Sequence, residues 1–245
     1  MIPGMILAAG RGERMRPLTD RVPKPLLEVG GKSLLVWQLE GLVQAGVDRV
    51  VINTAHLGAQ IPLALGDGSP WGARLRYSPE PEGALETAGG IATAQPWLWE
   101  GQESEYFALA NGDVYAEFSW DPLLKHCLAH WPNAAKAILV MVPSPDHHPR
   151  GDFRLPCRAF GPLLPLEESN PLAREEHLTY SGLGVFHRSL FEFCQPGARA
   201  ALGPLLRSAS ESGQVFGWPF EGAWVDVGTP ERLAALDARL RSARA

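Results

Sequence analysis

Short apolar runs alternate with amphipathic stretches through the first half of the chain. Apolar, often β-branched runs predict strands at 5–9, 49–53, 75–78 and 106–110. Apolar residues at helical spacing predict helices at 33–45, 56–65 and 87–98. Ser33 is a good helix N-cap, and Gly46 is suited to end that same helix. Such alternation of strands and helices is typical of an α/β fold with parallel strands.

The second half of the chain is less regular. Its apolar runs predict strands at 137–142, 179–186 and 224–227. A further helix is predicted at 202–211. Thr229 as N-cap and Pro230 at the first helical position predict a last helix over 231–241. The stretch 162–176 is rich in proline and glutamate, which favours a surface excursion. No internal repeat or long linker interrupts the sequence, so we expect one domain over 1–245.

Composition and charge narrow the class of protein. Hydrophobic residues make up 45% of the 245, enough to bury a core, and no apolar run is long enough to span a membrane. The apolar start lacks a basic leader, so we read it as a buried strand and not as a secretory signal. A net charge of −5 argues against nucleic acid as a partner, and three widely separated cysteines fit a reducing cytoplasm.

A locally positive segment with two glycines lies near the N-terminus. Between residues 11 and 32 there are six basic side chains (Arg11, Arg14, Arg16, Arg21, Lys24, Lys32) and three acidic ones (Glu13, Asp20, Glu28). Gly10 and Gly12 allow the backbone to approach an anion closely, which favours a small polyanion as ligand. The dinucleotide fingerprint fails because Met15 stands where its third glycine belongs. The P-loop motif fails because Leu26 replaces its first glycine.

Polar residues follow several of the predicted strands. In open parallel sheets ligands bind outside the carboxyl ends of strands, and Asn111-Gly112-Asp113 is in such a position. Asp226 follows another apolar strand, and Thr229 already caps the helix after it, so Asp226 is not needed as a cap. Two carboxylates from different strand ends can converge on one Mg²⁺, a hard cation that combines few carboxylates with phosphate oxygens and water.

Five strings spread over nearly the whole chain then point to a family. They are Leu-Ala-Ala-Gly-Arg-Gly-Glu-Arg-Met-Arg-Pro-Leu-Thr at 7–19, Pro-Lys-Pro-Leu at 23–26, Leu-Glu-Thr-Ala-Gly-Gly at 85–90, Asn-Gly-Asp at 111–113 and Trp-Val-Asp-Val-Gly-Thr at 224–229. Together they resemble the signature of the sugar-1-phosphate nucleotidyltransferases. The resemblance implies a three-layer α/β/α, Rossmann-like fold with a mixed, mostly parallel central sheet. It also implies a nucleotide-binding half at 1–115 and a sugar-phosphate-binding half at 116–245.

The resemblance implies a role for each matching residue. The implied catalytic residues are Arg16, Lys24 and Asp113, and the implied Mg²⁺ ligands are Asp113 and Asp226. The implied nucleotide-binding residues are Leu7, Ala9, Gly10, Arg11, Gly12, Glu13, Lys24, Glu86, Thr87 and Gly89. The implied sugar-phosphate-binding residues are Asn111, Gly151, Glu168, Ser181 and Gly182. The segment 86–90 is also compatible with a plain helix start capped by Thr87.

The implied reaction joins a nucleoside triphosphate to a sugar 1-phosphate. Attack on the α-phosphorus releases pyrophosphate, with Lys24 beside the α-phosphate and Arg16 beside the leaving group. The strings at 66–80 and 147–155 most resemble the members of the family that use UTP and N-acetylmuramate 1-phosphate in peptidoglycan recycling. Many relatives carry a Glu-Lys-Pro string on the sugar side, whereas Glu167-Glu168-Ser169 here has no lysine, so the cation that holds the sugar's phosphate stays open. His147 and His148 are expected to be solvated.

Several alternatives remain open at this stage. Sibling activities are mannose-1-phosphate guanylyl transfer and glucose-1-phosphate uridylyl or thymidylyl transfer. A nucleotide-sensing regulatory subunit would lose the metal or phosphate residues, but Arg16, Lys24, Asp113 and Asp226 are all present. A glycosyltransferase would normally carry an Asp-x-Asp motif, and Asp113 is followed by Val114 and Tyr115. The sequence leaves the choice between a monomer and a homodimer open.

Overall fold

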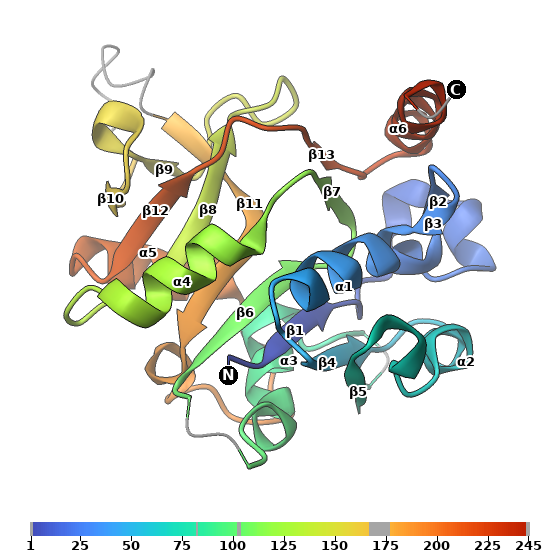
Figure 1. Cartoon of the computed structure of the whole chain (residues 1–245), viewed down its shortest axis with the longest axis horizontal. Helices are drawn as coiled ribbons and strands as arrows, with labels where there is room; N and C mark the ends of the chain where they lie inside the picture. Colours follow the sequence, from blue (N-terminus) through green and yellow to red (C-terminus); the bar gives the residue numbers. More distant parts are fainter. Residues whose placement is uncertain (1, 82, 102–103, 167–176, 244–245) are drawn as a thin grey trace.

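A mixed sheet forms the centre of the protein. The computed structural model describes residues 2–81, 83–101, 104–166 and 177–243. Within them nine strands form one sheet: β1 (Gly4–Leu7), β4 (Arg49–Thr54), β5 (Arg74–Pro79), β6 (Tyr106–Asn111), β8 (Ala137–Pro143), β9 (Phe153–Arg154), β10 (Gly161–Pro162), β11 (His177–His187) and β12 (Val215–Pro219). The order of neighbours is β10-β12-β8-β11-β6-β1-β4-β5, and β9 pairs with β11 (Figure 1).

Strand directions confirm the mixed, mostly parallel sheet. β1 lies between β4 and β6 and is parallel to both, so that Leu7 is level with Asn53 on one side and Asn111 on the other. β5 is parallel to β4, and β12 is parallel to β8. β11 runs antiparallel to β6 and β8, and β10 runs antiparallel to β12. The carboxyl ends of β5, β4, β1 and β6 therefore share one edge.

Both faces of this sheet are covered by helices, which confirms the three-layer arrangement. Successive residues of a strand point to opposite faces, and Met5 and Ile6 of β1 accordingly lie in different hydrophobic clusters. The Ile6 cluster includes residues of α1 (Leu34–Gln44), α2 (Gln60–Leu65) and α4 (Trp120–His130). The Met5 cluster includes residues of α3 (Glu86–Leu98) and α5 (Leu202–Glu211). No helix in the described part of the chain is long and apolar enough to cross a membrane.

A third, smaller hydrophobic cluster joins the two ends of the chain. Helix α6 (Pro230–Ser242) packs beside a hairpin of β2 (Glu28–Val29) and β3 (Lys32–Ser33) (Figure 1). Gly30, at the tip of the hairpin, donates its N–H to Asp237 at 2.8 Å, and this bond lowers the pKa of Asp237. A Cβ at Gly30 would lie 2.9 Å from the Leu240 Cβ, so the close approach requires glycine there.

The predicted helix caps are present. The Ser33 hydroxyl accepts the Val36 N–H at 3.3 Å, and the Thr229 hydroxyl accepts the Arg232 N–H at 3.4 Å. Two helix starts differ from prediction. α2 begins at Gln60 and not at residue 56, because Leu57 has a left-handed backbone with φ 52°. α3 begins one residue before Thr87, which therefore does not cap it.

One strand that the sequence pattern did not predict is β12. Its glycine and terminal proline weaken the strand signal. A Cβ at Gly217 would lie 2.7 Å from the Leu163 side chain, so the glycine admits close packing over the sheet. The predicted excursion at 162–176 starts at the end of β10, and residues 167–176 lie outside the described residues.

The aromatic cluster around Phe107 gives a test of the core. Phe107 is fully buried and lies 5.6–5.9 Å, between ring centroids, from Trp99, Phe186 and Phe191. Phe107→Ala should lower the free energy of unfolding by about 3–5 kcal/mol through the cavity it leaves. Phe193 is 89% exposed and supplies the matched control. Phe193→Ala should change the free energy of unfolding by less than about 0.5 kcal/mol. Urea unfolding measures both, and equal shifts would contradict the assigned core.

Candidate active site

The loop after β1 is held by a small set of polar contacts. Gly12 has a left-handed backbone with φ 68°, and its carbonyl accepts the Thr19 hydroxyl at 2.9 Å. Arg11 contacts Glu13 at 2.7 Å and the Nδ1 of His56 at 2.9 Å. The His56 Nε2 lies 2.8 Å from the Thr19 carbonyl oxygen. These contacts shape the loop from its outer side and leave its inner side facing the sheet.

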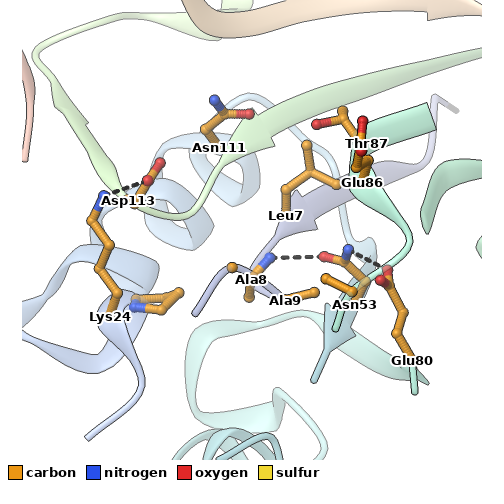
Figure 2. Close-up of a pocket in the computed structure, with 13 residues that line it drawn as sticks. Leu7, Ala8, Ala9, Lys24, Asn53, Glu80, Glu86, Thr87, Asn111 and Asp113 are labelled. Carbon is orange, nitrogen blue, oxygen red and sulfur yellow. Dashed lines mark hydrogen bonds and ion pairs between the residues drawn. The ribbon is translucent and has the colours of Figure 1, made fainter. Parts of the chain in front are cut away.

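A cleft opens at the shared carboxyl edge of β5, β4, β1 and β6, where the sequence predicted a ligand site. Its lining comes from those strand ends, from the turn that holds Lys24 and from the start of α3 (Figure 2). The lining residues are Leu7, Ala8, Ala9, Gly10, Lys24, Pro25, Asn53, Glu80, Ala84, Glu86, Thr87, Asn111 and Asp113. Many of the residues implied to bind nucleotide or to act in catalysis therefore meet in one place.

Lys24 and Asp113 form an ion pair at the wall of this cleft. The Lys24 Nζ lies 2.6 Å from the Asp113 Oδ2, and the Lys24 side chain is only 9% exposed, against 36% for Asp113. Lys24 begins a short 3₁₀ turn, Lys24–Leu26, that follows Pro23. Asp113 follows Gly112, where a Cβ would lie 2.8 Å from the Leu7 carbonyl oxygen. The glycine thus allows the chain after β6 to fold closely across β1.

A chain of hydrogen bonds on the opposite wall was not predicted in full. The Asn53 Oδ1 accepts the Ala8 N–H at 2.7 Å, and its Nδ2 donates to the Glu80 Oε1 at 2.7 Å (Figure 2). The Glu80 Oε2 accepts the Leu85 N–H at 2.8 Å. Glu80 therefore ties the start of α3 to the glycine-rich loop. The sequence shows Asn53 as the end of a predicted strand and Glu80 only as the last residue of the string at 66–80, which assigns no role to Glu80.

The start of α3 has an unusual backbone. Ala84 and Glu86 both have left-handed φ values, 49° and 59°, which L-residues rarely adopt. Glu86 also forms an exposed ion pair with Arg199 at 3.1 Å. Such strained residues persist only where surrounding contacts hold them, and they are frequent at ligand sites. Here the Glu80 bond to the Leu85 N–H supplies one such contact.

Asp226 reaches the same region from the C-terminal part of the chain. Strand β13 (Trp224–Asp226) pairs with β7 (Val114–Ala116), with Asp226 opposite Val114, and the Val227 N–H donates to the Asp113 carbonyl at 3.2 Å. This pairing brings Asp226, at the end of β13, beside Asp113, which directly precedes β7. The Asp226 Oδ2 lies 3.0 Å from the Arg232 Nη1 and 3.5 Å from the His147 Nε2.

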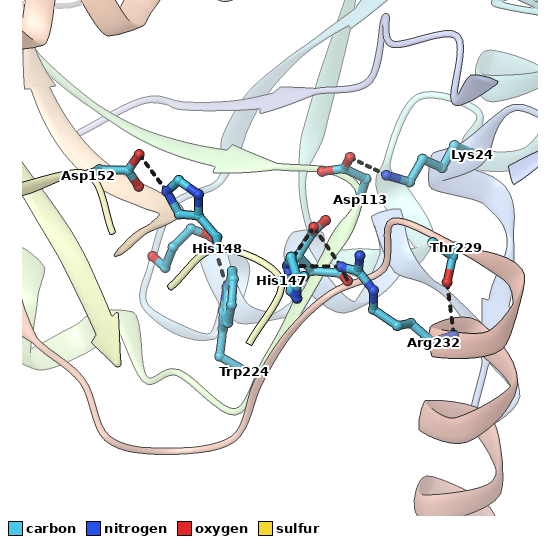
Figure 3. A network of polar contacts seen from close by, with 10 residues as sticks. Lys24, Asp113, His147, His148, Asp152, Trp224, Thr229 and Arg232 are labelled. Atoms are coloured by element: carbon cyan, nitrogen blue, oxygen red, sulfur yellow. Dashed lines mark hydrogen bonds and ion pairs between the residues drawn. The ribbon is translucent and has the colours of Figure 1, made fainter. Parts of the chain in front are cut away.

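His147 and His148 keep part of the solvent exposure that was predicted, 38% and 41% of their side chains, but both also make specific polar contacts. His147 contacts Asp226 and Arg232, whereas His148 lies 3.2 Å from the Asp152 Oδ1 (Figure 3). A turn between β8 and β9 directs the two neighbouring rings at different carboxylates. The sequence could not show the His147–Asp226 contact, because it depends on how distant strands are paired; Asp152, by contrast, is only four residues from His148.

Residues of the predicted sugar side surround a second hollow next to the cleft. Its lining residues are Thr87, Asn111, Asp152, Phe153, Tyr180, Leu202, Gly203, Leu206 and Arg207, of which Thr87 and Asn111 also line the first cleft. The Asp152 Oδ2 accepts the Tyr180 N–H at 2.9 Å. Burial, and secondarily the Asp152 carboxylate, raises the pKa of Tyr180, so its phenol stays protonated at neutral pH. The Tyr180 hydroxyl is buried and has no hydrogen-bond partner within the described structure.

Glycines set the shape of this sugar side. Gly182 has φ 84°, and a Cβ there would lie 2.6 Å from the Asn111 Nδ2. Gly151 has φ 67°, and a Cβ there would lie 2.7 Å from the Leu178 carbonyl oxygen. The Ser181 carbonyl accepts the Trp224 indole N–H at 2.9 Å. Gly151, Ser181 and Gly182 therefore support the site through the backbone.

The remaining predicted residues lie apart from the cleft lining. Gly89 is buried within α3, with its N–H donating to the Ala200 carbonyl at 3.1 Å, and a Cβ there would overlap the Ala198 carbonyl oxygen. Arg16 is exposed and pairs with Asp20 at 2.8 Å. Arg11 and Glu13 pair on the outer side of the loop, and Glu168 lies outside the described residues. The ligand-binding roles of these residues stay predictions.

Comparisons with known proteins agree with this arrangement. The family model for nucleotidyl transferases matches residues 3–242. N-acetylmuramate alpha-1-phosphate uridylyltransferase from Neisseria meningitidis is 46% identical over 96% of both chains. The enzyme of the same name from Caulobacter vibrioides is 32% identical over 98% of this chain and 97% of its own. The chain therefore belongs to the nucleotidyl transferase family, and the resemblance to sugar-1-phosphate nucleotidyltransferases is confirmed.

A solved structure supports the fold. A protein from Bacillus anthracis provisionally assigned as a glucose-1-phosphate thymidylyltransferase, crystallised with sucrose, superposes with a TM-score of 0.82. The superposition covers 98% of this chain and 96% of that one at 19% identity. At such low identity the likeness establishes the shared fold.

The Asn53–Glu80 contacts give a test of how the cleft wall is held. In Glu80→Gln a single carbonyl oxygen cannot accept from both Asn53 and Leu85, so one donor loses its partner. We expect the free energy of unfolding to fall by about 1–3 kcal/mol and the KM for the nucleoside triphosphate to rise. Glu100→Gln is the matched control, since Glu100 is 55% exposed and lies 3.8 Å from Arg76. Urea unfolding and initial rates measure the effects; two indistinguishable variants would rule out this role for Glu80.

Proposed function

We propose that the protein transfers UMP from UTP to N-acetylmuramate 1-phosphate and releases pyrophosphate. The observation that carries the proposal is the Lys24–Asp113 pair in a cleft at the carboxyl edge of the sheet. The relative that is 46% identical over almost the whole chain bears the name of this activity, which supports the choice of substrates.

The cleft offers distinct surfaces to the parts of a nucleoside triphosphate. Gly10 is exposed in the cleft lining, and a Cβ there would meet nothing within 4 Å, so its backbone is open to a phosphate. Glu86 and Thr87, at the start of α3, present backbone and short side-chain groups to the base. Lys24 lines the same cleft beside Asp113, where it can neutralise the α-phosphate.

Asp113 and Asp226 are the residues that would hold Mg²⁺. Asp226 ends β13 and Asp113 directly precedes its partner strand β7, and no larger cluster of His, Cys, Asp or Glu suited to a metal occurs in the described ranges. Two carboxylates fit Mg²⁺, which completes its coordination with substrate phosphates and water. When bound, the ion would neutralise phosphate charge between the two substrates. Each carboxylate also faces a cationic side chain, Lys24 for Asp113 and Arg232 for Asp226.

The chemical task of the protein is to bring two polyanions together in line. The nucleophile is a phosphate oxygen that is already anionic at neutral pH, so no general base is needed. Lys24 draws charge from the α-phosphate as the bond to pyrophosphate breaks. The sugar 1-phosphate would enter over Asn111, which the cleft shares with the second hollow. Positioning of the two substrates and neutralisation of their negative charge then account for the rate of nucleotidyl transfer.

A substrate panel tests the proposed function. Pyrophosphate release should be fastest with UTP and N-acetylmuramate 1-phosphate among combinations of UTP, GTP, dTTP and ATP with hexose, N-acetylhexosamine and N-acetylmuramate 1-phosphates. EDTA should abolish it, and added Mg²⁺ should restore it. A preference for GTP with mannose 1-phosphate would replace this proposal with the sibling activity. Binding of UTP with no pyrophosphate release from any pair would favour a sensing role.

Lys24→Ala tests the central charge. We expect kcat to fall by roughly 10²- to 10³-fold, because one preorganised cation at the reacting phosphate is lost. The fold should persist, since Asp113 is 36% exposed and remains hydrated without its partner. Lys32→Ala is the matched control, because Lys32 pairs with Glu40 at 2.6 Å and does not line the cleft. A Lys24→Ala enzyme with near-normal kcat and an unchanged Tm would remove Lys24 from the proposed mechanism.

A further inference from the structure

The second hollow lies between the starts of two helices. The Leu85 carbonyl accepts the Ala200 N–H at 3.0 Å, and the Ala200 carbonyl accepts the Ala88 N–H at 2.9 Å. These bonds tie the segment before α5 to the start of α3. The first turns of α5 are thereby brought beside the cleft, and Leu202, Gly203, Leu206 and Arg207 of α5 line the hollow.

Arg207 supplies a positive charge to this hollow. Its side chain runs back along α5, and a Cβ at Gly203, one turn earlier, would lie 3.4 Å from the Arg207 Nη1. Long helical side chains lean toward the helix N-terminus, and glycine at 203 leaves room for the guanidinium to lie low over the helix. Arg207 is exposed and pairs with no carboxylate in the described part of the chain, and it is the one cationic side chain in the lining.

The other polar groups of the hollow suit a sugar. The Asp152 carboxylate can accept hydrogen bonds from sugar hydroxyls, and the buried, unpartnered Tyr180 hydroxyl lies in the same wall. Because Asp152 also repels anions, an anionic group is favoured only near Arg207. Asn111 and Thr87 line both hollows, whereas Arg207 lines only the second, so Arg207 lies on the side away from Lys24.

We infer that Arg207 recognises a carboxylate on the acceptor sugar. This inference rests on the proposed function and names the feature of the substrate that Arg207 selects. The sugar's 1-phosphate must lie near Lys24 for the reaction, so a second anion at Arg207 has to come from another position of the sugar. An N-acetylmuramate carries such a group, the carboxylate of its lactyl ether, and N-acetylglucosamine lacks it. Arginine binds carboxylates with two parallel N–H donors, which makes it a selective reader.

The test compares acceptors with and without this carboxylate. With the intact enzyme and UTP, kcat/KM is measured for N-acetylmuramate 1-phosphate, for its lactyl amide and for N-acetylglucosamine 1-phosphate. Acceptors that turn over too slowly are measured by their inhibition constants. Arg207→Gln should raise KM for the acid by roughly 10- to 100-fold and leave the values for the two acceptors without a carboxylate within about twofold. Arg207→Lys should restore part of the preference for the acid.

Arg76→Gln, on the edge strand β5, is the matched control and should change no acceptor, because Arg76 is 64% exposed and remote from both linings. An equal loss of kcat/KM with all three acceptors would assign Arg207 to the phosphate that they share and would overturn the inference. An unchanged kcat/KM with all three acceptors would also overturn it. If the wild-type enzyme uses UTP with another sugar 1-phosphate and rejects N-acetylmuramate 1-phosphate, the proposed function itself fails. Wild-type turnover of the acid with an unchanged preference in Arg207→Gln overturns this inference alone.

Discussion

The site depends on one nearly buried ammonium group, that of Lys24, which lies where the two anionic substrates are proposed to meet. Lys24 is 9% exposed, and removing an ammonium from water costs several kcal/mol unless a counter-charge offsets it. Asp113 supplies that charge at 2.6 Å. Packing fixes the lysine stem, because a Cβ at Gly12 would lie 3.1 Å from the Lys24 Cβ. The second glycine of the N-terminal motif is therefore required by the lysine that follows it and by its own left-handed backbone.

The position of Asp113 depends in turn on the C-terminal part of the chain. Its carbonyl accepts the Val227 N–H, and the strand after it pairs with β13. Beyond β13, helix α6 packs on the β2–β3 hairpin and bonds Gly30 through Asp237. The glycine-rich loop and the last helix thus both support the same edge of the sheet. This arrangement explains why recognisable motifs occur at both ends of the sequence, although each end alone would show only a loop or a helix cap.

Much of this structure could be predicted from local patterns, and the exceptions have physical causes. Ser33 and Thr229 cap their helices as predicted, because capping depends on residues only three apart. Parallel strand ends placed Asn111 and the nearby Asp113 at one cleft, because sheet geometry fixes where polar ends meet, whereas Lys24 reaches that cleft on a turn and was indicated only by the family motif. Glu80 and the His147–Asp226 contact were missed, because their partners lie 27 and 79 residues away and depend on strand order.

The turn between β8 and β9 connects the two sides of the site. His147 contacts Asp226, on the proposed metal side, and its neighbour His148 contacts Asp152, on the proposed sugar side. Because the two rings are adjacent in the chain, the geometry of a single turn decides both contacts. Asp152 also holds the backbone of Tyr180, and therefore the strand that carries Gly182 against Asn111. One short turn therefore contributes a contact to Asp226 and a contact to Asp152, so the proposed metal side and the proposed sugar side share one structural support.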